Sequence, residues 1–405
     1  MTDIPFQSIA GGLTAPRGFR AAGVACGIKA SGNLDLMLLA ADARASAAAV
    51  FTTNRAQAAP VVLSRDHLVK SGGHGRAVVI NSGCANACTG ADGWEHAQAM
   101  AKQTAAAIGC DPSAVLVAST GVIGVKLPMD KVERGIVDAA AKLSPSNGAD
   151  AARAIMTTDP FPKEHAIEAS AKGRTFRVGG IAKGSGMIEP LMATMLGVVT
   201  TDAAVEPELL QRALKAVVDD TFNAITVDGE CSTNDCVFAL ASGSSGVTLT
   251  DADWPALVAA LRAACEPLAI GIVRGGEGAT KLVTVNVKGA ASDADARLTA
   301  RAIANSPLVK TAIHGGDPNW GRLIAVAGRS GAAFSLERAA VRIGSIVLFS
   351  DGAPYDERAP QAAEYLQGKD IEVEVDLGTG GSGRSRMWTC DLSAEYVRIN
   401  AEYRT

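Results

Sequence analysis

One stretch near the middle of the chain carries the most information about its fold: Gly180-Ile-Ala-Lys-Gly-Ser-Gly-Met-Ile-Glu-Pro-Leu-Met-Ala-Thr-Met-Leu-Gly-Val-Val199. Its first half is a flexible glycine segment, and its second half runs through Ala193 and Thr194 into an apolar strand. A threonine hydroxyl is a poor nucleophile unless a base accepts its proton. A free α-amine on the same residue, with a pKa of about 8, can be that base. That amine exists only if the peptide bond before Thr194 is cut.

The residue pair at this bond is compatible with self-cleavage. The small side chain of Ala193 leaves room for the Thr194 hydroxyl to attack the preceding carbonyl, which gives an ester that water can open. The same pair is also typical of a chain that simply enters a strand. The residues alone leave both interpretations open.

Short β runs and alanine-rich helical stretches alternate on either side of this segment. Strands are expected at 77–81, 115–118, 222–228, 236–241, 281–287, 308–313, 322–326 and 371–377. Helices are expected at 127–143, 207–218, about 253–268, and from about 393 to near the carboxyl terminus. Because the expected strands and helices follow one another in mixed order, the sequence predicts a layered α/β fold, with mixed β-sheets between helix layers, rather than a regular βαβ series.

Composition narrows the possible partners. The 405 residues are 48% hydrophobic but only 4% aromatic, which predicts a core of Ala, Val, Leu and Ile. Lys plus Arg is 38 and Asp plus Glu is 42, a formal charge of −4 without a basic run, so we expect a small soluble metabolite and no nucleic acid. The first residues lack the pattern of a secretory leader, and we expect no apolar run near the roughly 18 residues of a membrane span. A cytoplasmic protein is expected.

Two features that can suggest cofactors are interpreted as structural. Eight cysteines, expected to be reduced thiols, include Cys84-x3-Cys88 and Cys231-x4-Cys236, but neither pair has a second pair or clustered histidines, so no metal site is expected. Gly378-x-Gly380-x-x-Gly383 matches the dinucleotide fingerprint, which requires a helix next. Residues 385–390 look like a strand instead, so a glycine-rich hairpin is predicted and no nucleotide site.

Several motifs, in order along the chain, together resemble one known family. They are Thr14-Ala-Pro-Arg-Gly-Phe19, Val50-Phe-Thr-Thr-Asn54, Asn81-Ser-Gly-Cys-Ala-Asn86, Ser119-Thr-Gly-Val-Ile-Gly124, Met156-Thr-Thr-Asp159, Lys183-Gly-Ser-Gly-Met-Ile188, Met192-Ala-Thr-Met-Leu196, Asn223 to Asp235, and His314-Gly-Gly-Asp-Pro-Asn-Trp-Gly-Arg322. The chain is similar, from near residue 10 to its end, to the ornithine acetyltransferase (glutamate N-acetyltransferase) family of arginine biosynthesis.

The resemblance implies a fold shared with self-processing aminopeptidases. It implies cleavage between Ala193 and Thr194 into an α chain of residues 1–193 and a β chain of 194–405, assembled as a heterotetramer. The family's nucleophile falls on Thr194 and its oxyanion hole on Thr120 and Gly121, which alone would look like a strand-end turn. The family's substrate contacts fall on Thr157, Lys183, Thr194, Glu277, Asn400 and Thr405. The 317–322 motif is given no catalytic role.

The activity implied by the resemblance proceeds in two half-reactions. Thr194 takes the acetyl group of N-acetyl-ornithine, and glutamate then takes it from the threonine, with no cofactor. Acetyl-CoA as a second donor stays open, because no motif separates the two kinds of family member. Two alternatives also stay open: an aminopeptidase or amidase that passes the acyl group to water, and a non-enzymatic binding protein for an acidic amino acid.

The last ten residues are expected to take part in the site. Tyr396, Ile399 and Tyr403 recur at helical spacing and can dock a helix, which would bring Asn400 and Thr405 to the substrate.

Overall fold

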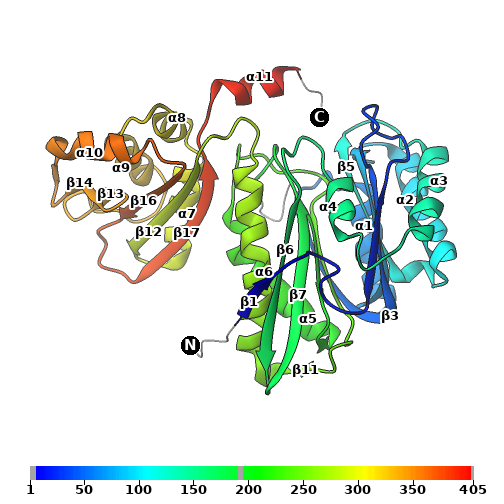
Figure 1. Cartoon of the computed structure of the whole chain (residues 1–405). Coiled ribbons are helices and arrows are strands. Elements are labelled where there is room, and N and C mark those ends of the chain that lie inside the picture. Colours follow the sequence, from blue (N-terminus) through cyan, green and yellow to red (C-terminus); the bar gives the residue numbers. More distant parts are fainter. Residues whose placement is uncertain (1–5, 190–194, 403–405) are drawn as a thin grey trace. The chain divides into compact units, whose positions relative to one another are not determined.

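The computed structural model describes residues 6–189 and 195–402, which fall into two compact units (Figure 1). Within the described ranges, the first unit holds residues 6–189, 195–223 and 230–272. The second unit holds residues 224–229 and 273–402.

A nine-stranded mixed sheet organises the first unit. Its strands are β1 (Phe6–Ile9), β2 (Phe19–Val24), β3 (Leu36–Phe51), β4 (His74–Cys84), β5 (Val115–Val122), β6 (Lys163–Ala171), β7 (Arg174–Lys183), β8 (Leu196–Thr201) and β10 (Cys236–Ala241). Their order is β1-β6-β7-β8-β10-β3-β4-β5, with β2 paired to β3. The pairs β8–β10 and β4–β5 are parallel and the others antiparallel. The short strands β9 (Ala204–Val205) and β11 (Thr248–Leu249) pair separately.

The long strand β3 divides this sheet into two layers. Its residues 36–41 pair with β2, and its residues 46–51 pair with β10. Strand β4 pairs with residues 36–40 and, after a shift in register, with Ala45 and Ser46. One buried cluster contains side chains from both halves, such as Met37 and Ile80 from one and Ile181 and Phe238 from the other. The two halves therefore face each other across an apolar core.

Helices cover the outer faces of both layers. They are α1 (Ala59–Lys70), α2 (Gly90–Ile108) and α3 (Met129–Ala141) on one side, and α5 (Pro207–Asp220) and α6 (Trp254–Arg274) on the other, with α4 (Gly148–Ala154) packed beside β2 and β3. Figure 1 shows α2 and α3 on one side of these strands and α5 and α6 on the other. This α/β arrangement confirms the prediction of mixed sheets between helix layers.

The second unit is a six-stranded sheet packed against helices. Its strands are β12 (Leu282–Ala290), β13 (Ala340–Ile343), β14 (Ile346–Ser350), β15 (Ala353–Pro354), β16 (Asp370–Asp376) and β17 (Gly383–Cys390), in the order β15-β14-β13-β16-β12-β17. Its helices are α7 (Asp293–Ala304), α8 (Pro307–Gly315), α9 (Trp320–Gly328), α10 (Ala359–Tyr365) and α11 (Ala394–Glu402). Across both units, the described residues also form the 3₁₀ turns η1 (Pro112–Ala114), η2 (Phe222–Ala224), η3 (Asp251–Asp253) and η4 (Asp356–Arg358).

Most of the expected elements are confirmed. The predicted strands at 77–81, 115–118 and 236–241 lie within β4, β5 and β10, and those at 281–287 and 371–377 fall within β12 and β16 except for one end residue each. The predicted helices at 127–143, 207–218 and 393 onward are α3, α5 and α11, and α5 begins at Pro207 as expected.

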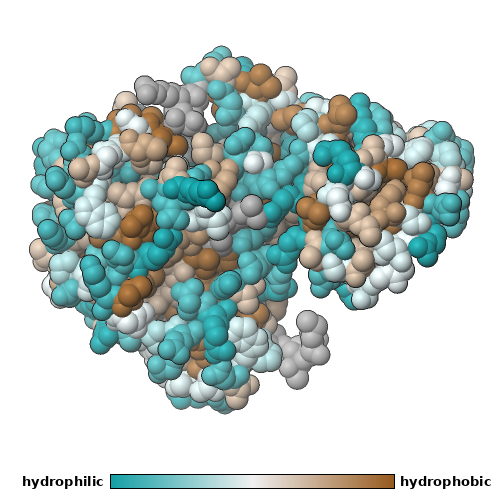
Figure 2. Space-filling model, turned by 180° about the vertical axis from the view of Figure 1, so that it is seen from behind, coloured by the Kyte–Doolittle hydropathy of each residue, from teal (hydrophilic) through white to brown (hydrophobic). Residues whose placement is uncertain are grey.

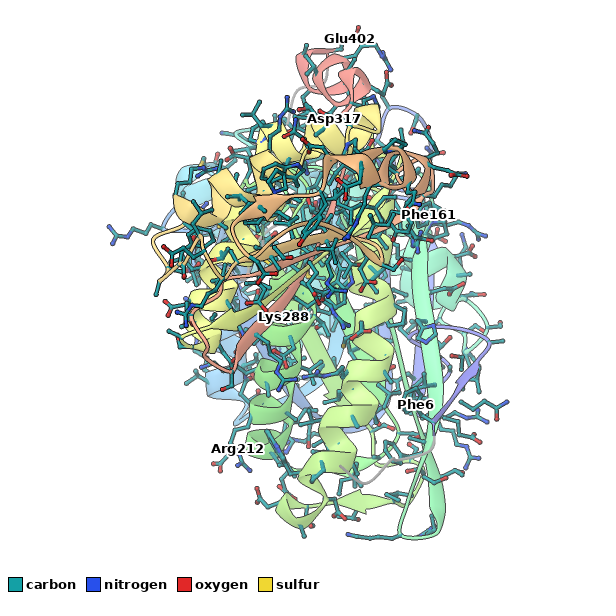
Figure 3. The ribbon with its side chains drawn as sticks, turned by 90° about the vertical axis from the view of Figure 1, so that its left-hand side faces the viewer. Phe6, Phe161, Arg212, Lys288, Asp317 and Glu402 are labelled. Atoms are coloured by element: carbon teal, nitrogen blue, oxygen red, sulfur yellow. The ribbon has the colours of Figure 1, made fainter. Side chains whose placement is uncertain are left out.

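Two predicted strands, at 308–313 and 322–326, are wrong because these segments are the helices α8 and α9. Ser306 caps α8 by accepting the N–H of Val309, and Asn319 caps α9 by accepting the N–H of Arg322. The buried residues of α9 are Leu323, Val326 and Ala327, which is helical spacing. Asp317 lies on the turn between the two helices (Figure 3) and accepts the Nδ2–H of Asn319 at 3.0 Å.

Two further expectations about strands are also corrected. The predicted strand at 222–228 is the turn η2 followed by irregular chain, whose Ile225 makes only an isolated bridge with Trp388. The predicted hairpin at 378–383 is wrong because β16 and β17 lie on opposite sides of β12 and do not pair. The glycine-rich segment therefore crosses the end of β12, and a strand follows it, so the dinucleotide fingerprint lacks its helix.

Helix α6 is longer and more apolar than expected. It passes through Pro267 and ends at Arg274, directly before the predicted break at Gly275 and Gly276. The segment Asp251–Arg274 is long and apolar enough to cross a membrane by length and composition, so the expectation that no such run exists is wrong. Half of its most apolar window is buried, with Leu261 and Leu268 at 1% exposure, which is typical of a core helix.

Hydrophobic residues on the face shown in Figure 2 are scattered among hydrophilic ones. The eight cysteines are free thiols, of which four are buried and Cys88 is exposed.

Candidate active site

The ends of the parallel strands β4 and β5 form the floor of the candidate site. Ser82 pairs with Thr120 and Gly83 with Gly121, and the register becomes irregular at Cys84. Gly121 has φ of +128°, a backbone conformation that favours glycine. A Cβ added at Gly121 would lie 2.3 Å from the carbonyl carbon of Gly83, so only glycine fits here.

Buried amides hold this edge in place. Ser119 donates its hydroxyl to Asn81 Oδ1 at 2.6 Å, and Asn81 donates Nδ2–H to the carbonyl of Cys84 at 2.8 Å. Asn234, from the turn before β10, donates Nδ2–H to the carbonyl of Ser119 at 2.9 Å. The backbone on the N-terminal side of Thr120 is therefore fixed by side chains that are themselves buried.

This geometry predicts that Gly121→Ala is strongly destabilising. A positive φ costs about 1 kcal/mol for alanine, and the overlap with Gly83 adds about 1–3 kcal/mol. We expect the free energy of unfolding to fall by about 2–4 kcal/mol, measured by urea denaturation. Gly124→Ala is the matched control, because Gly124 also has positive φ, at +79°, but nothing lies within 4 Å of an added Cβ. Equal losses in the two variants would show that the close approach to Gly83 has no consequence.

Lys183 reaches this edge from another strand. It is the last residue of β7, it is 6% exposed, and its Nζ donates to Thr120 Oγ1 at 3.2 Å. A hydroxyl that accepts one hydrogen bond keeps its own hydrogen for donation. Lys183 thus orients Thr120 while leaving its O–H available to an oxyanion. Two residues predicted from the sequence, 63 positions apart, are in contact.

The predicted nucleophile lies outside the described residues, as does Ala193, but the chain around them is placed. Lys183 is in register with Leu196, two residues after Thr194. Leu196 begins β8, which lies between β7 and β10. Cys236 of β10 donates its N–H to the carbonyl of Met195 at 3.2 Å. The segment that follows Thr194 therefore enters an interior strand of the sheet.

A buried carboxylate, Asp159, connects Lys183 to the predicted contact residue Thr157. Asp159 accepts the N–H of Thr157 at 3.0 Å and the N–H of Gly184 at 2.7 Å. It also forms an ion pair with Lys163, at 2.5 Å, in which the two side chains are 0% and 2% exposed. Residues 157, 159, 163 and 183 therefore form one cluster.

The charges in this cluster do not balance. Burial alone would raise the pKa of Asp159, but Lys183, Lys163 and the Gly184 N–H outweigh it and lower that pKa to about 2. Burial lowers the pKa of Lys163, and Asp159 opposes this effect. Among the described residues of this cluster, two buried lysines thus face one carboxylate, and Lys183 is the one that contacts Thr120. Such a site favours an anionic ligand.

The second unit brings together two other predicted residues. Glu277 is 7% exposed and accepts the Nδ2–H of Asn400 at 2.9 Å. The turn that carries Glu277 is tied to the start of α11, because Ser393 donates its hydroxyl to the carbonyl of Gly278 at 2.6 Å. Glu277 is therefore a buried, hydrogen-bonded carboxylate rather than a solvated loop charge. Thr405 lies outside the described residues.

The docking face predicted for α11 is only partly present. Tyr396 and Ile399 are half-buried, no residue of this helix is fully buried, and Tyr403 lies outside the described residues. Figure 3 labels Glu402 at the end of the helix. Tyr396 donates its hydroxyl to Asp228 at 3.3 Å, so a polar contact helps to hold α11.

The predicted residues thus form two groups, one in each unit. Thr120, Gly121, Thr157 and Lys183 belong to the first, and Glu277 and Asn400 to the second. Lys163 was not predicted from the sequence, and Asp159 was named only as the last residue of the motif Met156-Thr-Thr-Asp159. The signal for this pair was two opposite charges four residues apart, which in most proteins indicates a surface pair.

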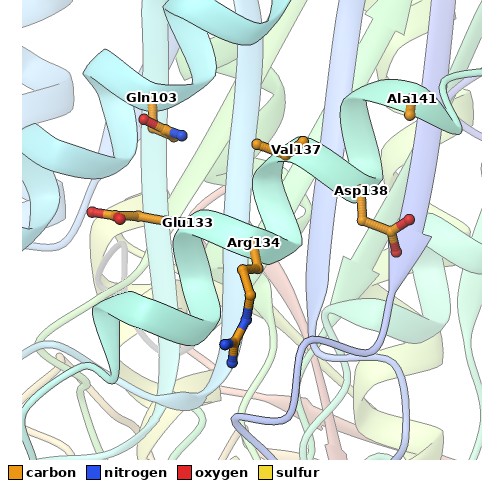
Figure 4. Close-up of a pocket in the computed structure, with 6 residues that line it drawn as sticks. All are labelled: Gln103, Glu133, Arg134, Val137, Asp138 and Ala141. Carbon is orange, nitrogen blue, oxygen red and sulfur yellow. The ribbon is translucent and has the colours of Figure 1, made fainter.

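Two other features do not define the site. A groove of about 580 Å³ is lined by Gln103, Glu133, Arg134, Val137, Asp138 and Ala141 of α2 and α3, which include none of the predicted site residues (Figure 4). Across residues 6–189 and 195–402, no three His, Cys, Asp or Glu side chains are grouped as metal ligands.

The chain is similar in sequence to a described protein family and to several named proteins. A sequence model described as the ArgJ family matches residues 20–405. The arginine biosynthesis bifunctional protein ArgJ of Synechococcus sp. is 51% identical, with 100% of both chains covered. A crystal structure of the protein of that name from Bacillus halodurans is 46% identical, has a TM-score of 0.49, and covers 51% of this chain and 98% of its own. An ornithine acetyltransferase complexed with ornithine, from Mycobacterium tuberculosis, is 42% identical, has a TM-score of 0.43, and covers 46% of this chain and 98% of its own.

Proposed function

The chain belongs to the ArgJ family, and on this basis we propose that it is a glutamate N-acetyltransferase of arginine biosynthesis, moving an acetyl group from N-acetyl-L-ornithine to L-glutamate. The observation that carries the proposal is the contact between Lys183 and Thr120, beside the start of β8. It joins a buried cation to the proposed oxyanion-binding hydroxyl, next to the strand that follows Thr194.

The reaction starts from a free Thr194 amine. This amine accepts the proton of the Thr194 hydroxyl as the oxygen attacks the acetyl carbonyl. Negative charge develops on the carbonyl oxygen, where the hydroxyl of Thr120 and the N–H of Gly121 stabilise it. The carbon–nitrogen bond then breaks, the leaving nitrogen takes the proton, and ornithine departs from an acetyl-threonine ester. The amine of glutamate attacks this ester, which regenerates Thr194 and releases N-acetylglutamate.

The other residues bind the amino-acid part of the substrate. Lys183 supplies a cation for a carboxylate, in the cluster where two described lysines face one carboxylate. Glu277 supplies an anion for the ammonium group of ornithine, and Asn400 orients Glu277 through the bond at 2.9 Å. Thr157 and Thr405 complete the contacts. No cofactor or metal is needed, because every step is an acyl or proton transfer.

The mature enzyme arises by cleavage between Ala193 and Thr194. The products are an α chain of residues 1–193 and a β chain of 194–405, which assemble as a heterotetramer in the cytoplasm. Acetyl-CoA is a second donor to Thr194, which would agree with the word "bifunctional" in the names of the relatives.

An acetyl-transfer assay tests this proposal against its rivals. Purified protein is given glutamate with either N-acetyl-ornithine or acetyl-CoA, and N-acetylglutamate is measured beside free acetate. We expect N-acetylglutamate from both donors. Free acetate as the main product would identify an amidase, and a single uncut chain with neither product would identify a binding protein.

The carboxyl terminus gives a separate prediction. Deleting Asn400 to Thr405 removes the partner of Glu277, whereas self-cleavage is expected to need only the groups around Thr194. Self-cleavage should therefore stay intact, while transfer falls by about 10²-fold, as when substrate-positioning contacts are lost. Asn400→Ala in the full-length chain is the narrower variant and should show the same separation. Near wild-type transfer by the truncated enzyme would remove both residues from the site.

A further inference from the structure

A second lysine, Lys29, lies on a tightly held loop next to the candidate site. The loop joins β2 to β3, and the carboxylate of Asp35, which is 0% exposed, accepts four of its backbone N–H groups. These N–H groups belong to residues 26–29 and lie at 2.7–3.0 Å. Lys131 of α3 donates to the carbonyl of Gly27 at 2.8 Å. The backbone at Lys29 is therefore fixed from two sides.

The stem of this lysine packs against the floor of the site. A Cβ added at Gly83 would lie 3.2 Å from Cγ of Lys29, so the absence of a side chain at Gly83 makes room for that stem. Gly83 has φ of +102°, a second reason for glycine at this position. Gly83 is the strand partner of Gly121, which follows Thr120, the residue bound by Lys183. Lys29 thus packs against the strand residue that pairs with the oxyanion-binding edge.

The charges around Lys29 place it in the same electrostatic environment as Lys183. Burial lowers the pKa of Lys29, Lys183 lowers it further, and Asp35 and Asp159 oppose these effects. The Nζ of Lys29 donates to the carbonyl of Leu34 at 2.7 Å, which uses one of the three N–H bonds of an ammonium. An anion bound between Lys29 and Lys183 would relieve their repulsion and accept the remaining hydrogen bonds.

We propose that Lys29 is a second carboxylate-positioning residue, which together with Lys183 holds the α-carboxylate that the donor and acceptor amino acids share. The α-carboxylate is attached to the same carbon as the acetylated nitrogen, so it must lie close to the acetyl carbonyl held by Thr120 and Gly121. The side-chain ends of ornithine and glutamate extend farther away. This inference rests on the proposed acetyl transfer.

A donor without the carboxylate provides the test. N-acetylputrescine is N-acetyl-ornithine with a hydrogen in place of the α-carboxylate, so the ratio of kcat/KM for the two donors measures how much the carboxylate contributes. We expect Lys29→Met to reduce this ratio by about 10- to 100-fold, the range for a hydrogen bond to a charged group. Lys29→Arg should keep the ratio within about 3-fold of wild type. The inhibition constants of ornithine and putrescine give the same comparison without turnover of the weaker donor.

Lys131→Met is the matched control, because it loosens the same loop without removing the cation of Lys29. It should leave the ratio unchanged, and cleavage into two chains reports that each variant folds. An equal fall for both donors in Lys29→Met would mean a merely structural role and would overturn the inference. Loss of the proposed function itself looks different, because wild-type enzyme would then transfer acetyl from neither donor.

Discussion

Thr194→Ala will stay a single chain of 41.3 kDa and will lose acetyl transfer. Alanine has no hydroxyl, so neither the acyl shift that cuts the bond after Ala193 nor the attack on the donor can occur. We expect transfer to fall by at least about 10⁴-fold, as when a catalytic nucleophile is removed. Denaturing electrophoresis measures the first effect, and N-acetylglutamate production measures the second.

Two variants control this result. Thr194→Ser keeps a hydroxyl and should still be cut, more slowly than wild type. Thr175→Ala removes an exposed threonine from the neighbouring strand β7 and should behave as wild type. Cutting of Thr194→Ala between residues 193 and 194 at the wild-type rate would exclude Thr194 as the processing nucleophile.

Asp159→Asn is expected to be the most destabilising substitution in the described part of the site. It leaves Lys163, 4% exposed, without its carboxylate, and it weakens the acceptor for the N–H groups of Thr157 and Gly184. Removing one partner of a buried ion pair costs about 3–5 kcal/mol. The urea midpoint should fall accordingly, and transfer should fall because Asp159 holds the backbone N–H of Gly184, the residue after Lys183.

The exposed pair Asp138–Lys142 is the matched control, since it has the same spacing of four residues but side chains 47% and 57% exposed. Asp138→Asn should cost at most about 0.5 kcal/mol. Adding Lys163→Met to Asp159→Asn removes the stranded charge and should recover part of the loss. Equal midpoints for the Asp159 and Asp138 variants would show that burial of the first pair has no energetic consequence.

The same carboxylate predicts how stability depends on pH. The pKa of Asp159 falls from an ordinary value of 3.8 to about 2 on folding, so its ionised form stabilises the folded state. This stabilisation is complete above about pH 4 and is lost as pH falls from 3.8 towards 2. Asp159→Asn has no such contribution, so its difference in midpoint from wild type should shrink over this window.

The layered fold could be predicted because apolar runs and prolines mark its main elements. Residues 236–241 and 207–218 were placed correctly from local pattern alone. The strands predicted at 308–313 and 322–326 are helices because caps at Ser306 and Asn319 outweigh a short β-like run. Both capping residues are present in the sequence. The two strand predictions are wrong because they gave the short apolar run more weight than the capping residue before it.

The site could be predicted only in part, since its contacts join residues that are distant along the chain. The family resemblance identified Thr120 and Lys183 as site residues. The hydrogen bond between them depends on the order of strands in the nine-stranded sheet, which the sequence does not show. The burial of Glu277 depends in the same way on the fold, since its hydrogen-bond donor Asn400 lies 123 positions away. No local pattern distinguishes a buried Asp159–Lys163 pair from a surface one, because burial is set by the whole fold.

The measurement that tests acetyl transfer through Thr194 most directly is the intact mass of the β chain after incubation with N-acetyl-ornithine alone. One acetyl group should appear on that chain and should disappear when glutamate is added. Double-reciprocal plots at several glutamate concentrations should then give parallel lines. An unmodified β chain together with intersecting lines would contradict the acetyl-threonine intermediate and would indicate direct transfer within a ternary complex.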